Sequence, residues 1–157
     1  MKRLILLITI LLPLSTYAQI PEIEQLGKEA KRQRGVEHES VGSFMLGMAS
    51  TFADKSQRAT FEMLDNIEMI TCTNDAYSPT LKRRIMAIIA SIGAEYLTTT
   101  NDERGENEVY AKIKSNIVRE LIILTTGKDG GFAIVAMSGE IPTERLGEIA
   151  KLSPPNK

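Results

Sequence analysis

The sequence has very few of the residues on which disulfide scaffolds, metal sites and hydrolytic triads depend. Its 157 residues include one cysteine, Cys72, one histidine, His38, and no tryptophan. A single cysteine cannot form an intramolecular disulfide, so we expect core packing to stabilise the fold. Zinc sites normally use three or four protein ligands, usually His or Cys, and a hydrolytic triad requires a histidine that only His38 supplies. Four tyrosines and four phenylalanines also make a poor platform for stacking sugars.

No excess of one charge points to a partner. The chain has 19 basic and 20 acidic residues, for a formal net charge of -1. Binding to nucleic-acid phosphates needs clustered Lys and Arg. The densest basic cluster is interleaved with acids, as is typical of a solvated helix face; it consists of Lys28, Lys31, Arg32 and Arg34, beside Glu22, Glu24 and Glu29. We therefore expect no nucleic-acid partner.

The sequence also lacks the motifs of nucleotide, calcium and serine-hydrolase sites. Gly127 and Lys128 resemble the end of a phosphate-binding loop, but Ile122 stands where the first glycine is required and Asp129 where Ser or Thr is required. The acidic segment 101–108 has its glycine at the fifth position rather than the sixth, so it does not fit an EF-hand. No serine lies in a G-x-S-x-G turn. We expect no metal and no cofactor, and an enzyme is the less favoured interpretation.

The first eighteen residues have the layout of a signal peptide. Two basic residues precede an apolar run over residues 4–14, and Thr16 and Ala18 are the small residues that signal peptidase selects. The run is shorter than the roughly 20 apolar residues of a membrane-spanning helix, and no lipid-anchoring cysteine follows the site. We predict cleavage of residues 1–18 before Gln19, and a mature chain that is periplasmic or secreted, without a transmembrane anchor.

The first half of the mature chain predicts two helices and two strands. Apolar residues at spacings of three and four predict a helix over residues 20–34, which ends at Gly35. The segments 36–43 and 67–73 predict strands, the first short and polar and the second apolar, with Cys72 as a small buried hydrophobe. Between them, one face of a short helix is expected in the core because Met is a common core filler; it is formed by Met45, Met48, Ala49 and Phe52.

The second half predicts a regular helix followed by a β-meander. Ser78 and Pro79 begin a helix whose apolar residues recur to Ile92. Short turns then separate four predicted strands, over residues 95–100, 108–114, 117–126 and 132–138, and the last two strands are apolar enough to be central. A final helix begins near Pro142. We expect Ile122, Leu124, Ile134 and Val135 on these strands to pack against Ile85, Ile88, Ile89 and Ile92 on the helix.

These elements together predict an α+β fold. The expected sheet is mixed but mainly antiparallel, with about five or six strands, a C-terminal four-strand meander and about four helices. One domain would span residues 19–153, followed by a disordered tail over residues 154–157. A replacement of His38 by Ala is expected to cost little, because we expect a surface or edge histidine.

Two kinds of binding site are compatible with such a sheet. The favoured hypothesis is a non-enzymatic module that binds an envelope protein or peptide at a sheet edge, through Glu37, His38, Glu39 and Ser40. The alternative is a small-ligand carrier or enzyme with a pocket between sheet and helices, for which the candidate polar residues are Glu95, Tyr96, Tyr110, Lys112 and Arg119.

The order of segments resembles a known family of small exported proteins. TYAQ is followed by GVEHESVGSFML, NIEMITC and LKRRIMAIIA, then by EYLTTTNDERGENEVYAKIK and IVRELIILTTGKDGGFAIVAMSGEIPTERLGEI. Over nearly the whole mature chain, this pattern is similar to the family called domain of unknown function 4252. The resemblance implies an envelope location in Gram-negative bacteria, and it implies no activity or catalytic residue. Family members often look like lipoproteins, whereas this chain has no lipobox.

Overall fold

The computed structural model describes residues 20–149, apart from the side chains of Ser56 and Glu148. The predicted signal peptide and C-terminal tail lie outside this range. The elements in chain order are α1 (Pro21–Ala30), β1 (Val36–Gly42), α2 (Ser43–Phe52), α3 (Lys55–Phe61), β2 (Leu64–Cys72), α4 (Ser78–Ile92), β3 (Glu95–Asn101), β4 (Gly105–Lys114), β5 (Ile117–Gly127), β6 (Phe132–Pro142), a 3-10 turn η1 (Thr143–Arg145) and α5 (Leu146–Ile149).

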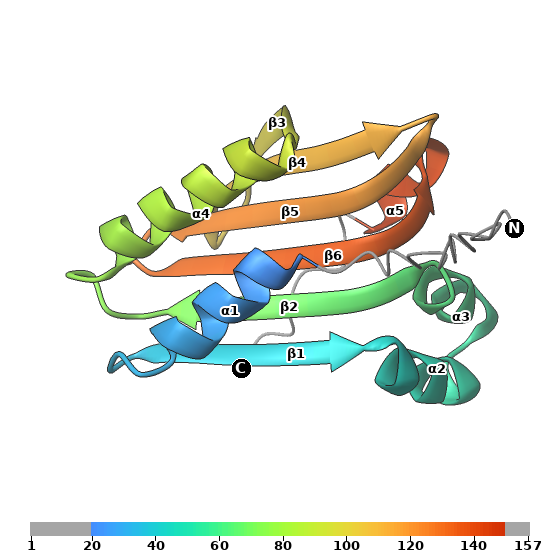
Figure 1. The fold of residues 1–157 in the computed structure, drawn as a ribbon, viewed down its shortest axis with the longest axis horizontal. Coiled ribbons are helices and arrows are strands. Elements are labelled where there is room, and N and C mark those ends of the chain that lie inside the picture. Colours follow the sequence, from blue (N-terminus) through green and yellow to red (C-terminus); the bar gives the residue numbers. More distant parts are fainter. Residues whose placement is uncertain (1–19, 150–157) are drawn as a thin grey trace, which may run out of the picture.

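The strands form one six-stranded sheet in the order β1-β2-β6-β5-β4-β3 (Figure 1). Strands β3 to β6 are the predicted C-terminal meander, and β6 then pairs with β2 to join it to the N-terminal hairpin. All five strand pairs among the described residues are antiparallel. The predicted α+β class is confirmed, and so is the central position of β5 and β6.

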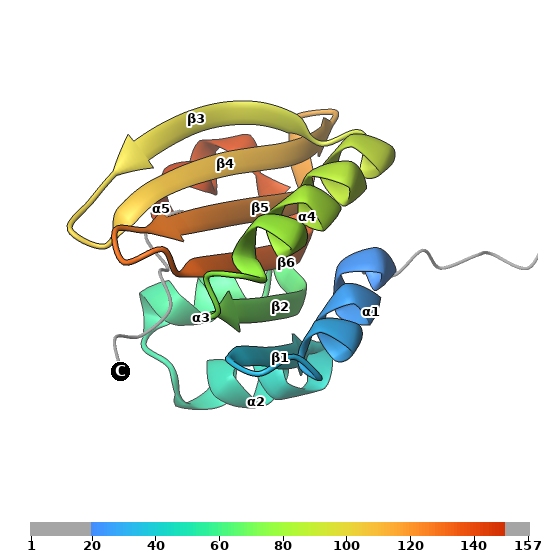
Figure 2. The same ribbon diagram turned by 90° about the vertical axis from the view of Figure 1, so that its left-hand side faces the viewer.

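Helices α1 and α4 cover one face of the sheet (Figures 1 and 2). Pro79 stands in the first turn of α4, and the left-handed Gly93, with φ of 73°, ends it. Its buried Ile85 and Ile89 share a core with sheet residues Ile122, Leu124 and Ile134, as predicted, while Ile88 and Ile92 are partly buried at the margin of this core. This face of the molecule therefore follows the helical and strand periodicities directly.

The opposite face carries a second core under α2, α3 and α5 (Figure 2). Val135 belongs to this second core, together with Leu121 and Met137. The prediction that Val135 packs against α4 is wrong, because successive side chains of a strand point to opposite faces and Ile134 already faces the helix. Figure 1 shows α2 and α3 at the end of β1 and β2, and α5 behind the sheet.

Several boundaries differ from the predictions: α1 ends at Ala30 rather than at residue 34, β4 begins at Gly105 rather than at residue 108, and β6 runs to Pro142 rather than to residue 138. Residues 55–61 form α3, a helix that the sequence patterns did not predict. The Asp54 carboxylate accepts a hydrogen bond from the Gln57 backbone N–H at 2.9 Å, the contact by which an aspartate begins a helix. Strand β2 begins at Leu64 rather than at residue 67, and its residues alternate between buried and half-buried. Glu68 therefore lies on the same buried side as Ile70 and Cys72.

Candidate functional site

Helix α2 turns an apolar stripe to solvent. Phe44, Met48 and Phe52 follow one another at a spacing of four residues, so they lie on one side of the helix, and they are 77, 48 and 87% exposed. Met45, beside them, is 56% exposed. Only Leu46 is buried, and it joins the second core. Ala49 is exposed as well, so the prediction that Met45, Met48, Ala49 and Phe52 form the core face of this helix is wrong.

This stripe is large and carries no charge. None of the ten residues of α2 is acidic or basic. The two phenylalanine rings alone expose roughly 300 Å² of apolar surface. Exposed apolar patches of about 300 to 600 Å² are the largest that typical monomers carry, and they are often functional. The sequence could not reveal the stripe, because a Phe and Met stripe has the same spacing whether it faces the core or solvent.

Strand β1 leads directly into α2 and forms one edge of the sheet. It pairs with β2 on one side, and no described strand pairs with the other side (Figure 1). The exposed side chains of Glu37 and Glu39 point to the face opposite His38, because side chains alternate along the strand. The open side of β1 therefore combines unpaired backbone groups with two carboxylates.

The helix-facing side of β1 is fixed to β2 by a buried carboxylate. Glu68 is 1% exposed, and its Oε2 lies 2.7 Å from His38 Nε2. Because an ionised carboxylate only accepts hydrogen bonds, His38 donates from Nε2. Ser40 Oγ and Asn66 Nδ2 both donate to Glu68 Oε1, at 2.6 and 2.8 Å. Three side chains thus satisfy one buried acid and fix the register of the edge strand. Glu68, His38, Ser40 and Asn66 are called the Glu68 cluster below.

His38 is on an edge strand, but its side chain is not at the surface. That side chain is 5% exposed. Its ring packs under α1 at Gly27, where an added Cβ would lie 2.3 Å from His38 Cδ2. Only glycine leaves room for the imidazole at this helix position. The predicted edge residues therefore divide into two groups: Glu37 and Glu39 face outward, whereas His38 and Ser40 hold the strand in place.

The five residues predicted for a ligand pocket are paired mainly with near neighbours. Tyr96 and Tyr110 face each other on β3 and β4 as an edge-to-face pair, with ring centroids 5.7 Å apart. Burial, and then the nearby Glu108 carboxylate, raises the pKa of Tyr110. Lys112 lies 3.8 Å from Glu120, and Arg119 pairs with Glu140. Glu95 is exposed on the edge strand β3.

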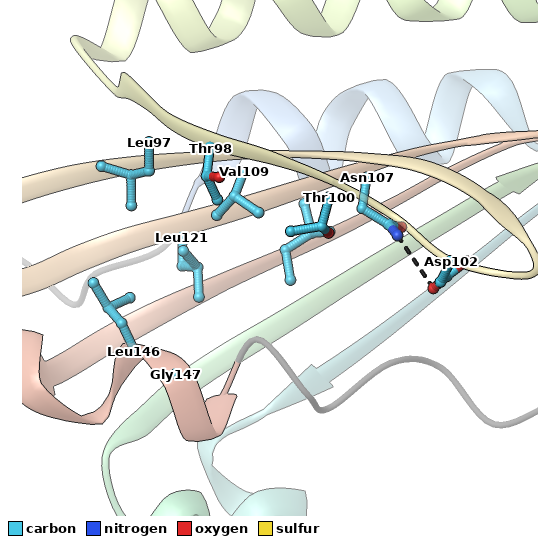
Figure 3. Close-up of a pocket in the computed structure, with 10 residues that line it drawn as sticks. Leu97, Thr98, Thr100, Asp102, Asn107, Val109, Leu121, Leu146 and Gly147 are labelled. Atoms are coloured by element: carbon cyan, nitrogen blue, oxygen red, sulfur yellow. Dashed lines mark hydrogen bonds between the residues drawn. The ribbon is translucent and has the colours of Figure 1, made fainter.

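A groove lies on the other face of the same strands (Figure 3). It has a volume of about 320 Å³ and runs between α5 and the sheet at β3, β4 and β5. Its walls are mainly apolar, and none of the five predicted pocket residues lines it; the lining residues are Leu97, Thr98, Thr100, Asp102, Asn107, Val109, Leu121, Ile123, Leu146 and Gly147. This groove is therefore distinct from the site proposed for the five residues, which stays a prediction.

The polar end of this groove is built around Asp102. Its Oδ1 accepts hydrogen bonds from the backbone N–H groups of Arg104 and Gly105, and its Oδ2 accepts one from Arg104 Nη2 at 3.0 Å. Oδ2 also accepts a hydrogen bond from Asn107 Nδ2 at 3.2 Å, the dashed line in Figure 3. The Arg104 side chain and backbone contacts lower the pKa of Asp102 to about 2. The carboxylate is therefore ionised at neutral pH, and its charge is balanced by Arg104.

Neither a group of metal-ligating side chains nor a membrane-spanning helix is found in the part of the chain that the structure describes. No three His, Cys, Asp or Glu side chains within residues 20–149 are grouped so that they could hold a metal ion. None of the described helices has the length and apolarity that spanning a bilayer requires. The single thiol, Cys72, is buried, and Ser78 Oγ lies 3.4 Å from its sulfur.

Comparison with known proteins places the chain in a family. No curated protein and no solved structure matches it significantly. A family model described as Domain of unknown function (DUF4252) matches residues 30–149. The match runs from the end of α1 to α5 and so includes β1, α2, the Glu68 cluster and the groove. Because it covers most of the sequence, the chain belongs to the DUF4252 family.

Proposed function

We propose that this chain is an exported, non-enzymatic module that binds an extended segment of an envelope protein or peptide. The segment adds to the sheet at β1, and its apolar side chains rest on α2. The observation that carries this proposal is the outward apolar stripe of α2, directly continuous with an open edge strand. In strand addition, main-chain hydrogen bonds supply affinity and side-chain contacts supply specificity.

Strand β1 and helix α2 contribute different contacts to the bound segment. The free backbone groups of β1 fit an added strand of any sequence, whereas Phe44 and Phe52 offer large apolar surfaces for anchor residues. Met45 and Met48 lie between them, and Met side chains adapt to partners of different shape. The Glu68 cluster keeps β1 ordered before binding, which reduces the entropy that association costs.

Charge at the edge defines the partner further. Glu37 and Glu39 are exposed on the same face of β1. Opposite charges on facing strands contribute roughly 0.2 to 1 kcal/mol each, and like charges are unfavourable. The bound segment therefore carries Lys or Arg at alternate positions. Two copies of β1 paired around their acidic middle would bring glutamates together, so charge opposes self-association here.

Export is supported by the sequence of residues 1–18, which has the layout of a signal peptide. Cleavage before Gln19 would leave the buried Ile20 and all of α1 in the mature chain. Mass spectrometry of native material is expected to give a chain that begins at Gln19 or its pyroglutamate form. A cytoplasmic chain that still begins at Met1 would contradict export.

Synthetic peptides test the binding site. The probe is a fluorescent eight-residue peptide with Lys at alternate positions and Phe at both ends, and its control has Glu in place of Lys. Fluorescence polarisation is expected to show binding of the first peptide only. A double Phe44→Ser, Phe52→Ser variant should bind at least tenfold more weakly, since an anchor residue contributes more than about 1.4 kcal/mol. The matched control is Ile113→Ser, which removes an exposed apolar side chain on β4.

Two further changes separate strand addition from nonspecific attraction. Glu37→Lys with Glu39→Lys should reverse the preference between the two peptides, whereas Glu95→Lys, on the opposite sheet edge, should not. N-methylation of alternate peptide nitrogens removes the main-chain donors and should abolish binding. Strand addition at β1 would be refuted if Glu95→Lys weakened binding of the Lys peptide as much as the β1 variants do. Undiminished binding of the N-methylated peptide would also refute it.

A further inference from the structure

The groove beneath α5 is separate from the β1 and α2 surface and has its own lining. Its apolar walls come from three strands and α5, and Leu97, Val109 and Leu121 line it from the sheet (Figure 3). Pockets for small molecules are typically mostly apolar, with volumes from about 300 Å³ and a few polar groups that orient the ligand. A volume of about 320 Å³ lies at the lower end of this range. It holds roughly ten water-sized groups.

Gly147 keeps this groove open on the helix side. It lies in α5 and lines the groove, and an added Cβ would meet no atom within 4 Å. Within a helix, glycine is less favourable than alanine by roughly 0.5 to 1 kcal/mol. Because Gly147 belongs to the lining and a Cβ there is unobstructed, a longer side chain can be added at the groove wall without overlapping either core. The space is therefore sensitive to a single substitution that leaves the rest of the fold in place.

The polar end of the groove favours an uncharged head group. Asp102 is the only charged residue among the ten that line it, and its oxygens already accept four hydrogen bonds, two of them from Arg104. A carboxylate offers about four acceptor positions, so none is left for a cation. The Thr98 and Thr100 hydroxyls have no hydrogen-bond partner within the described residues. They can both donate to and accept from a neutral polar group.

We propose that this groove binds a slender, uncharged amphiphile of about ten heavy atoms, with its chain between Leu146 and the sheet and a hydroxyl head at Thr98 and Thr100. An anionic head would find no Lys or Arg in the groove lining to attract it. A cationic head would find the acidic oxygens occupied. The ligand class follows from volume, apolar walls and two neutral hydroxyls.

Three probes of equal chain length test this inference: decan-1-ol, decanoate and decylamine, each below its aggregation limit. Backbone amide NMR shifts of the full mature chain are followed during titration. Decan-1-ol is expected to shift the resonances of Thr100, Val109 and Leu146 in a saturable manner and to bind at least fivefold more tightly than either charged probe. Equal binding of decanoate, or no saturable shift with decan-1-ol, would overturn the assignment.

Variants connect the binding to the groove itself. Gly147→Leu should weaken the binding of decan-1-ol at least tenfold. The control is Gly47→Leu, at an equally unobstructed position on α2, and its affinity for decan-1-ol should stay within twofold of wild type. Thr100→Val keeps the shape and removes the hydroxyl, so a threefold to tenfold loss is expected. If Gly147→Leu fails to fold, Leu97→Ser on the opposite wall provides the same test. Undiminished binding by the folded wall variants would place the ligand elsewhere and refute the proposal.

Discussion

Replacement of His38 by Ala should destabilise the protein strongly, although the residue lies on an edge strand. Within the described residues, only the imidazole of His38 donates a hydrogen bond to Glu68 Oε2, and the two side chains are 5 and 2% exposed. Removal of the donor that partners a buried carboxylate costs about 3 to 5 kcal/mol, because the carboxylate is left buried without compensation. Ser40 and Asn66 still donate to Oε1, so we expect the lower end of this range.

The measurement is the urea midpoint of wild type, His38→Ala, Glu68→Gln and the double variant. A loss of about 3 kcal/mol corresponds to a midpoint shift of about 1.5 M at a denaturant slope of about 2 kcal/mol/M. Glu68→Gln should recover part of the loss in the His38→Ala background, since it removes the buried charge. Glu39→Ala, on the opposite side of the same strand, should change stability by less than about 0.5 kcal/mol.

Gly27 provides an independent test of the same contact. In wild type, Gly27→Ala should cost about 1 to 3 kcal/mol, because the new methyl group overlaps the ring of His38. In the His38→Ala background the same substitution should be neutral or stabilising, because the space is free and Ala favours helix. Additive effects, within about 0.5 kcal/mol, in both double variants would refute the reasoning.

Three other outcomes are expected from the described contacts. Ile89→Ala should lower the free energy of unfolding by about 2 to 5 kcal/mol in a urea titration, because Ile89 is 3% exposed in the core beneath α4. An unchanged urea midpoint would show that the buried face of α4 is wrongly assigned. Burial raises the pKa of Glu120 above 4.5, so ionisation of Glu120 favours the unfolded chain as pH rises. Glu120→Gln should therefore unfold at a higher urea concentration than wild type at pH 7 and at the same concentration below pH 4. Equal midpoints at pH 7 would contradict this. The contacts with Arg104 lower the pKa of Asp102 from 3.8 to about 2, so the ionised carboxylate stabilises the fold above pH 3.8, and this stabilisation is lost as pH falls toward 2. The difference in free energy of unfolding between wild type and Asp102→Asn should therefore shrink between pH 5 and pH 2.5. A difference that stays constant would exclude the charge as its cause.

Much of the fold could be predicted from local pattern. Helix α4 has regular apolar spacing with Pro79 near its start and Gly93 at its end, and the four strands of the meander are separated by short turns. Both features depend on residues that are close in sequence, so periodicity and turn chemistry identify them. Helix α3 was not predicted, because the contact of the Asp54 carboxylate with the Gln57 N–H that begins it leaves no apolar periodicity in the sequence.

The functional surfaces depended on contacts that sequence spacing does not contain. The stripe of Phe44, Met48 and Phe52 has a period that fits a buried or an exposed face equally well. Leu46 packs in the second core, so the opposite side of α2, with the stripe, faces solvent. Periodicity therefore predicted the helix, while packing against the sheet decided which side of it a partner can reach.

The contact between His38 and Glu68, and the groove, also depend on tertiary structure. Sequence alternation could place Glu68 on the side of Ile70 and Cys72, but only the pairing of β1 with β2 brings its carboxylate to His38, 30 residues away. The groove needs Leu146 and Gly147 of α5 beside Leu97 of β3, and these segments meet because the sheet order places β3, β4 and β5 together on the face that α5 covers. The sequence by itself determined the strands, the main helices and their apolar faces, because those depend on neighbours along the chain. Tertiary structure decided which polar groups are buried and where a ligand has room, because burial is set by residues that are distant in sequence and close in space.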